Sequence, residues 1–194
     1  ILIYTFSFLL LITSCVTAQP QTGSKYTIAE AKEMLKRHNY HRQEVKVDKL
    51  KWSNEIAAFA QDWADELAKK GCNIYHRDDN KYGENIFWGF GANYTPTYVT
   101  DSWADEKKLW NGEAVSMDNF GEIGHYTQMI WHKTTEVGCG IATCADGAVI
   151  VVCNYNPAGN FLGQSPLGYK LKSDSYRNGV CDRNQDLPDI DFFD

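Results

Sequence analysis

The sequence predicts an α+β protein in which a sheet lies between layers of helices. Apolar side chains recur at helical spacing in the first half of the chain, and two short β-rich runs follow later. Helical segments precede and follow strands in sequence, so a sheet between two helical layers is the natural packing. At 194 residues the chain is long enough for one compact domain with a sizeable core.

Two well-capped helices are expected first. Residues 26–45 form one, with Thr27 as N-cap and Glu30 completing a capping box. Residues 53–71 form the other, with Ser53 as N-cap. In this second helix the apolar positions that recur at helical spacing are Ile56, Phe59, Ala60, Trp63 and Leu67.

Two further helices are expected later in the chain. Residues 95–110 form the third, with Thr95 as N-cap and Pro96 at the first helical position. Gly124 to His132 suggests a short fourth helix.

Three strands complete the predicted fold. Residues 136–144 and 148–156 are β-rich and are separated by Ala145-Asp146-Gly147, which is a hairpin turn signal. Residues 82–90, bounded by glycines, are expected to form another strand.

Charge limits the possible partners. The net charge is −6, and residues 182–194 contribute −4 of it through five Asp against one Arg. Because no basic stripe exists, nucleic-acid binding is not expected. We expect a domain over 26–170 and a flexible acidic tail over 171–194.

The first 18 residues predict export. An apolar run of signal-peptide length ends in Val16-Thr17-Ala18, which is a suitable cleavage site. The run is short for a membrane span, so no transmembrane segment is expected in the mature chain. An alternative is a bacterial lipoprotein signal, because Ile12 to Cys15 fits a lipobox, and the mature protein would then be lipid-anchored through Cys15.

Export makes disulfides plausible. Removal of the first 18 residues leaves an odd number of cysteines, so one thiol is unpaired within the chain or pairs with another chain. Two bridges are expected in the domain, with Cys181 as the remaining thiol. The four cysteines of the domain are Cys72, Cys139, Cys144 and Cys153.

A carboxylate lies among large apolar residues on the third predicted helix. Val99, Trp103, Glu106 and Trp110 fall on one helical face, so Glu106 needs a partner or carries a raised pKa.

Three other titratable residues stand at comparable places. His76 follows the second helix, Glu84 precedes a strand, and His125 opens "GHYTQMIWHKTTEVGCG". With Glu106, they are candidates for one shared cleft. His38, His41 and His132 have no evident partner and are interpreted as surface or packing histidines.

Three ordered motifs carry a family resemblance. The stretch "GHYTQMIWHKTTEVGCG" resembles the first signature of the CAP superfamily, "VVCNYNPAGN" resembles its second, and "YGENI" resembles the segment that carries a family glutamate. The superfamily includes cysteine-rich secretory proteins, venom antigens and plant pathogenesis-related proteins, and the similarity runs from Tyr26 to Leu167. It implies a three-layer α-β-α sandwich with a central, mainly antiparallel sheet, the CAP or SCP domain fold.

The resemblance also implies a site. Its His/Glu tetrad corresponds to His76, Glu84, Glu106 and His125, and the spacing of Gln128 suggests that this residue orients His125. The cysteine spacing is similar to that of plant members and implies the pairs Cys72–Cys144 and Cys139–Cys153. Two further cysteines of plant members are missing from residues 112–124, a loop that corresponds to a sterol-binding region in some relatives.

Three functions follow as hypotheses. The first is a secreted, non-enzymatic protein that binds a sterol, a fatty acid or a protein target, with a tetrad able to bind zinc or another divalent metal that is not obligatory. The second is a metal-dependent, protease-like hydrolase in which Glu84 or Glu106 is the base. The third is a defence or signalling protein that acts through its loops. The tetrad is equally compatible with a metal-binding cleft and with a structural hydrogen-bond network.

Overall fold

A computed structural model describes residues 21–168 of the chain. The expected signal peptide over 1–18, including Cys15, lies outside the described residues. So does the expected acidic tail over 171–194, including Cys181.

The described residues form an α+β sandwich. Four strands, four α-helices and one 3-10 helix follow one another between residues 28 and 156. In chain order they are α1 (Ile28–Glu44), β1 (Lys51–Trp52), α2 (Asn54–Lys69), β2 (Gly83–Gly89), α3 (Pro96–Ala104), the 3-10 helix η1 (Asp105–Lys108), α4 (Phe120–Met129), β3 (Glu136–Thr143) and β4 (Val149–Asn156).

The sheet has the strand order β1-β3-β4-β2. β4 pairs antiparallel with both β2 and β3, whereas the two-residue β1 pairs parallel with β3. The prediction of a mainly antiparallel sheet is therefore confirmed. The sequence analysis missed β1, which is too short to show a pattern of alternation.

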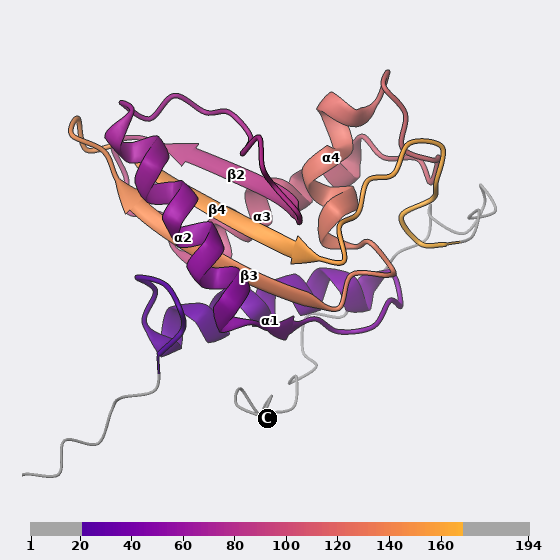
Figure 1. Ribbon diagram of the computed structural model, residues 1–194. Coiled ribbons are helices and arrows are strands. Elements are labelled where there is room, and N and C mark those ends of the chain that lie inside the picture. The colour runs from indigo at the N-terminus through magenta and orange to yellow at the C-terminus, as the bar shows by residue number, and fades with distance from the viewer. Residues whose placement is uncertain (1–20, 169–194) are drawn as a thin grey trace, which may run out of the picture.

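Helices cover both faces of the sheet (Figure 1). α2 crosses one face, where Ala60, Trp63 and Leu67 pack against Ile150 and Val152 of β4. On the opposite face, Val151, Cys153 and Tyr155 of the same strand join the core formed with α1, α3 and α4. The alternation of β4 side chains thus builds two cores in a three-layer α-β-α sandwich.

The approach of α2 to the sheet depends on glycine. A Cβ atom on Gly138 of β3 would lie 2.1 Å from the backbone nitrogen of Ala57, and one on Gly140 would lie 2.3 Å from the Cα of Gln61. Both positions therefore let the helix backbone rest directly on the strand.

The expected caps are present at three helices. The hydroxyls of Thr27, Ser53 and Thr95 each accept a hydrogen bond from a backbone N–H in the first turn, and Glu30 completes the capping box of α1. Two boundaries differ from expectation. α4 spans Phe120–Met129 instead of Gly124–His132, and the third α-helix ends at Ala104 instead of Trp110.

A buried arginine fastens α1 to the segment after α4. Arg42 is fully buried, and its guanidinium donates to the carbonyls of Met129, Trp131 and Thr134 as well as to that of Asp48. Burial lowers the pKa of Arg42 to about 10, so the side chain stays charged at neutral pH. Within residues 21–168, no helix combines the length and apolar character that a bilayer crossing needs.

Candidate functional site

The first histidine–carboxylate pair joins a loop to the sheet. His76 lies between α2 and β2, and its Nδ1 is 2.8 Å from Oε1 of Glu84 on β2. Glu84 also accepts from the backbone N–H of Arg77 and from the side-chain amide of Asn154. The hydrogen bond to Glu84 raises the pKa of His76, against the opposing effect of burial.

The second pair joins η1 to α4. Nδ1 of His125 is 2.5 Å from Oε1 of Glu106, and Oε2 of Glu106 accepts from the backbone N–H groups of His125 and Tyr126 at 2.9 and 3.0 Å. The ring of Trp103 lies nearly parallel to that of His125, at 11° and with centroids 6.2 Å apart. The partner that Glu106 was expected to need is therefore His125.

The tighter turn of η1 separates Glu106 from its apolar neighbours. Val99, Trp103 and Trp110 are buried as expected, whereas Glu106 is partly exposed. One continuous helix would have kept all four on one face. The change to 3-10 geometry after Ala104 turns the backbone so that Glu106 meets α4.

The two pairs leave the same ring atom free. In each imidazole Nδ1 faces a carboxylate, so the neutral form carries its proton there and has a lone pair on Nε2. Neither Nε2 atom makes a hydrogen bond within the described residues. This is the tautomer in which a carboxylate orients a histidine for metal binding.

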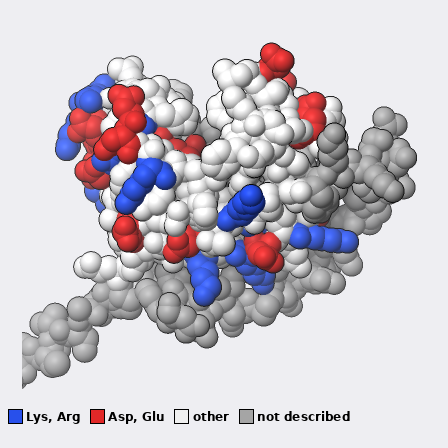
Figure 2. All heavy atoms as spheres, turned by 45° about the vertical axis from the view of Figure 1, so that its right-hand side comes forward, with Lys and Arg blue, Asp and Glu red and all other residues white. Residues whose placement is uncertain are grey.

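Within the described part of the chain, the His76–Glu84 and His125–Glu106 pairs do not join into a ready-made cluster of three or more His, Cys, Asp or Glu that could hold a metal ion. Figure 2 shows a notch between two raised parts of the surface, with acidic atoms near it. The histidines suit zinc by donor type, and water would have to complete the coordination sphere.

Gln128 does not orient His125, contrary to expectation. Its Oε1 accepts from the backbone N–H of Gly159 at 2.9 Å, and its amide lies 3.5 Å from the hydroxyl of Thr134. Gln128 therefore ties α4 to the loop after β4. Its spacing from His125 in sequence could not show which neighbour it meets.

Three residues around the pairs were not predicted. Asn154 supports Glu84, Trp103 lies against His125, and Asn85 donates to the carbonyl of His125. The sequence could have indicated Asn85 through its position next to Glu84, because neighbouring residues of a strand face opposite sides of the sheet.

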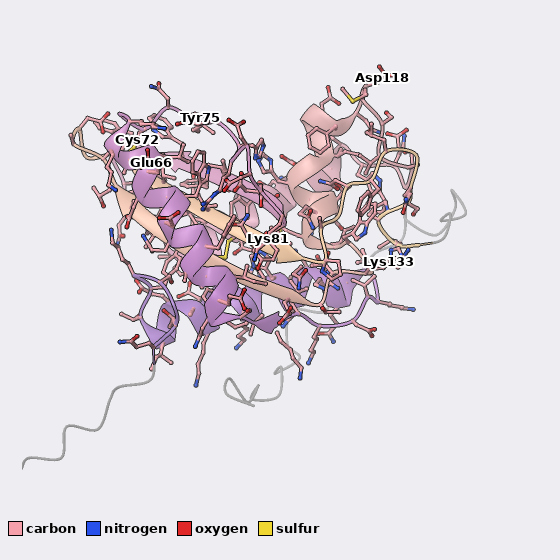
Figure 3. The ribbon with its side chains drawn as sticks, viewed as in Figure 1. Glu66, Cys72, Tyr75, Lys81, Asp118 and Lys133 are labelled. Carbon is pink, nitrogen blue, oxygen red and sulfur yellow. A yellow bond between two sulfur atoms is a disulfide. The ribbon has the colours of Figure 1, made fainter. Side chains whose placement is uncertain are left out.

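Both disulfides implied by the resemblance are present. Cys139 and Cys153 link directly opposed positions of β3 and β4. Cys72 and Cys144 link the end of α2 to the end of β3. Cys72 lies near Tyr75 at the start of the loop that carries His76 (Figure 3), so this bridge fixes one end of that loop.

The fold and a match to a known family define the class of protein. Residues 35–155 match the family described as "CAP: Cysteine-rich secretory protein family". The chain belongs to this family.

Plant proteins are among its relatives, as the cysteine spacing suggested. The chain is 38% identical to pathogenesis-related protein 1C of Nicotiana tabacum over 134 residues, which cover 69% of this chain and 79% of the relative. It is 35% identical to pathogenesis-related protein PR-1 of Medicago truncatula over 164 residues, or 82% and 94% of the two chains.

Solved structures share the architecture. The structure of BmVAL-1 has a TM-score of 0.63 and 26% identity, covering 78% of this chain and 86% of that one. A crystal structure of NaASP2 with Zn2+ has a TM-score of 0.61 and 25% identity, covering 76% and 88%.

Proposed function

We propose that this chain is an extracellular, non-enzymatic binding protein whose two paired histidines bind a divalent metal such as zinc. The observation that carries the proposal is the shared geometry of His76 and His125. Each ring donates from Nδ1 to a carboxylate and keeps Nε2 free as a ligand. The structure of the relative NaASP2 with Zn2+ supports the choice of metal.

The carboxylates suit a supporting role better than a catalytic one. Glu84 and Glu106 each accept three hydrogen bonds from fixed protein donors. A general base must be free to take a proton from substrate or water, and these oxygens are already engaged. This occupancy favours binding over hydrolysis.

We propose the extracellular location on two separate grounds. The two disulfides of the described domain fit an oxidising compartment, and the family to which the chain belongs is described as secretory.

Calorimetric titration of zinc into metal-free protein tests the metal site. Wild type is expected to bind, and His76→Ala/His125→Ala is expected to lose binding because carboxylates alone hold zinc poorly. His132→Ala is the matched control, because Nδ1 of His132 faces the carbonyl of Pro166 instead of a carboxylate. A double variant that melts like wild type and binds zinc with unchanged affinity would show that His76 and His125 do not form the zinc site.

The proposed partner of the loops is a sterol or a fatty acid. Backbone hydrogen bonds between Val115 and residues 163–164 bring two loops together. These loops and the start of α4 expose Met117, Phe120, Phe161 and Leu162. Because exposed apolar side chains gathered in one area mark binding surfaces, this area is the candidate lipid site.

A radiolabelled sterol or fatty acid tests the lipid site. Met117→Ser/Leu162→Ser is expected to weaken binding, whereas Ile74→Ser, an exposed apolar position on another loop, should leave it unchanged. Equal binding by all three proteins would remove these loops as the lipid site.

A further inference from the structure

Two neighbouring residues of β2 reach both halves of the histidine site. Glu84 faces the α2 side of the sheet and holds His76. Asn85 faces the opposite side, where its amide donates to the backbone carbonyl of His125 at 3.0 Å. Because adjacent strand residues point to opposite faces, one dipeptide contacts both histidine-bearing segments.

Asn85 is held by a buried chain of hydrogen bonds. Nδ1 of His38 lies 2.8 Å from the carbonyl of Met34, so this nitrogen carries the proton. The hydroxyl of Tyr155 donates to Nε2 of His38 at 2.9 Å, and it accepts from the amide of Asn85 at 3.2 Å.

The direction of every bond in this chain is fixed. Both ends are backbone carbonyls, of Met34 and His125, and a carbonyl only accepts. Burial lowers the pKa of His38 to about 4, so the ring is neutral near pH 7 and Nε2 accepts as the chain requires. Asn85, Tyr155 and His38 are all buried, so water does not compete for these bonds.

The start of β2 also lies directly against α4. A Cβ atom on Gly83 would lie 2.1 Å from Oε1 of Gln128. Gly83 therefore allows this close contact. Asn85 fixes the position of α4 along β2 through its hydrogen bond to the carbonyl of His125.

We infer that Asn85 is a positioning residue for the two-histidine site, because it fixes His125 to the same dipeptide that holds His76. The inference rests on the proposed metal binding. Asn85 touches no metal itself and acts by setting the separation of the two Nε2 atoms. Its loss leaves both imidazoles and both carboxylates present but no longer held at a fixed spacing.

The test compares two buried asparagines by zinc calorimetry. Asn85→Ala is expected to weaken zinc binding about 10- to 100-fold, the range typical of residues that support metal ligands. Asn39→Ala is the matched control, because Asn39 is equally buried and its side-chain amide makes two hydrogen bonds to the backbone of Leu50 instead of to a segment that carries His76 or His125. Its zinc affinity should match that of wild type.

A milder variant keeps the inference testable if Asn85→Ala fails to fold. Tyr155→Phe removes only the hydroxyl that links His38 to Asn85, and it should weaken zinc binding by a smaller factor. Affinities in Asn85→Ala and Tyr155→Phe that equal those of Asn39→Ala overturn the inference, while zinc binding by wild type leaves the proposed function intact.

A measurement on the metal-free protein distinguishes a failure of the proposed metal binding from a failure of the positioning role of Asn85. If wild type binds no zinc, the proposed metal function fails, and ring nitrogen NMR of the metal-free protein still tests Asn85. Asn85→Ala should change the His125 ring signals and leave those of His76 near their wild-type positions, whereas Asn39→Ala should move neither. Unchanged His125 signals in Asn85→Ala overturn the positioning role.

Discussion

His76 and His125 make the same hydrogen bond to a glutamate but stand on different kinds of backbone. His76 lies on a loop with its side chain 64% exposed, and its partner Glu84 is a strand residue with a side chain only 2% exposed. His125 and Glu106 both lie on helical segments, with side chains 39% and 19% exposed. In the first pair a buried acid holds an exposed histidine, whereas in the second the packing of two helices places both groups. The two halves of the site should therefore respond to different perturbations.

The largest effect is expected from the bridge that anchors the His76 loop. Cys72 and Cys144 are 72 residues apart, so removing the bridge with Cys72→Ser/Cys144→Ser should cost about 4 kcal/mol of unfolding free energy. Hydrogen exchange should rise in residues 73–82 and change less in α4. The control is Cys139→Ser/Cys153→Ser, in which the separation is 14 residues and the expected cost is about 3 kcal/mol. Faster exchange in α4 than in the loop would contradict the division into two halves.

Low pH should destabilise the protein through His38, which belongs to the buried chain of hydrogen bonds that ends at the carbonyl of His125. The folded-state pKa of His38 is about 4, below the ordinary value of about 6.5, so the unfolded chain binds the proton more readily. Stability is therefore retained above pH 6.5 and lost as the pH falls toward 4. At about 1.4 kcal/mol for each pH unit between the two values, the loss reaches about 3 kcal/mol.

Urea unfolding at pH 7 and pH 4 checks this expectation. The difference between the two pH values should be smaller in His38→Gln by about the same amount, because carboxylate titrations are common to both proteins. An equal difference in the two proteins would show that His38 does not carry the acid sensitivity.

A smaller loss of stability is expected from Glu106→Ala. The change removes three hydrogen bonds that join η1 to α4, and because the site is partly exposed the unfolding free energy should fall by about 2 kcal/mol. Asp105→Ala is the control, since the carboxylate of this exposed neighbour makes an i,i+3 ion pair with Lys108 within η1. Urea titration should give different unfolding curves for the two variants. Coincident curves would mean that Glu106 does not join these helices.

The smallest effect concerns the titration of His76. Its pKa is raised by Glu84, so NMR of the metal-free protein should show His76 titrating above the ordinary histidine value, and Glu84→Gln should bring it back down. The folded state holds this proton more tightly than the unfolded chain does. The pair therefore stabilises the protein at low pH, and its contribution is lost as the pH rises through the folded-state pKa. Because the ring is mostly exposed, the change in stability is small. A His76 titration that is unchanged in Glu84→Gln would show that the carboxylate does not act on the ring.

Local signals made most of the fold predictable. The caps Thr27, Ser53 and Thr95 were identified because each short polar side chain precedes a helical pattern, and all three act as expected. α4, whose N-cap Asn119 makes no side-chain cap bond to the helix, was placed four residues late. Its first turn lies in a stretch that had been interpreted as loop.

Long-range partners were harder to predict than elements. His38 and His41 were interpreted as surface or packing histidines without partners, yet both are buried and each ring bonds through both nitrogens. Tyr155 is 117 residues from His38, and Asp101 is 60 residues from His41. No spacing rule within one helix encodes such pairs, because they depend on how the helices pack against the sheet.

The hydrogen bonds of Arg42 couple the unfolding of two distant segments of the chain. Its guanidinium binds carbonyls that lie 87 to 92 residues further along the chain. If the segment from Met129 to Thr134 detached alone, the cation of Arg42 would keep only the carbonyl of Asp48 among its four acceptors, and the loss of the other three costs several kcal/mol. Partial opening at this point is therefore penalised. The end of α4 should come apart only when α1 does, so the two distant stretches of chain behave as one cooperative folding unit.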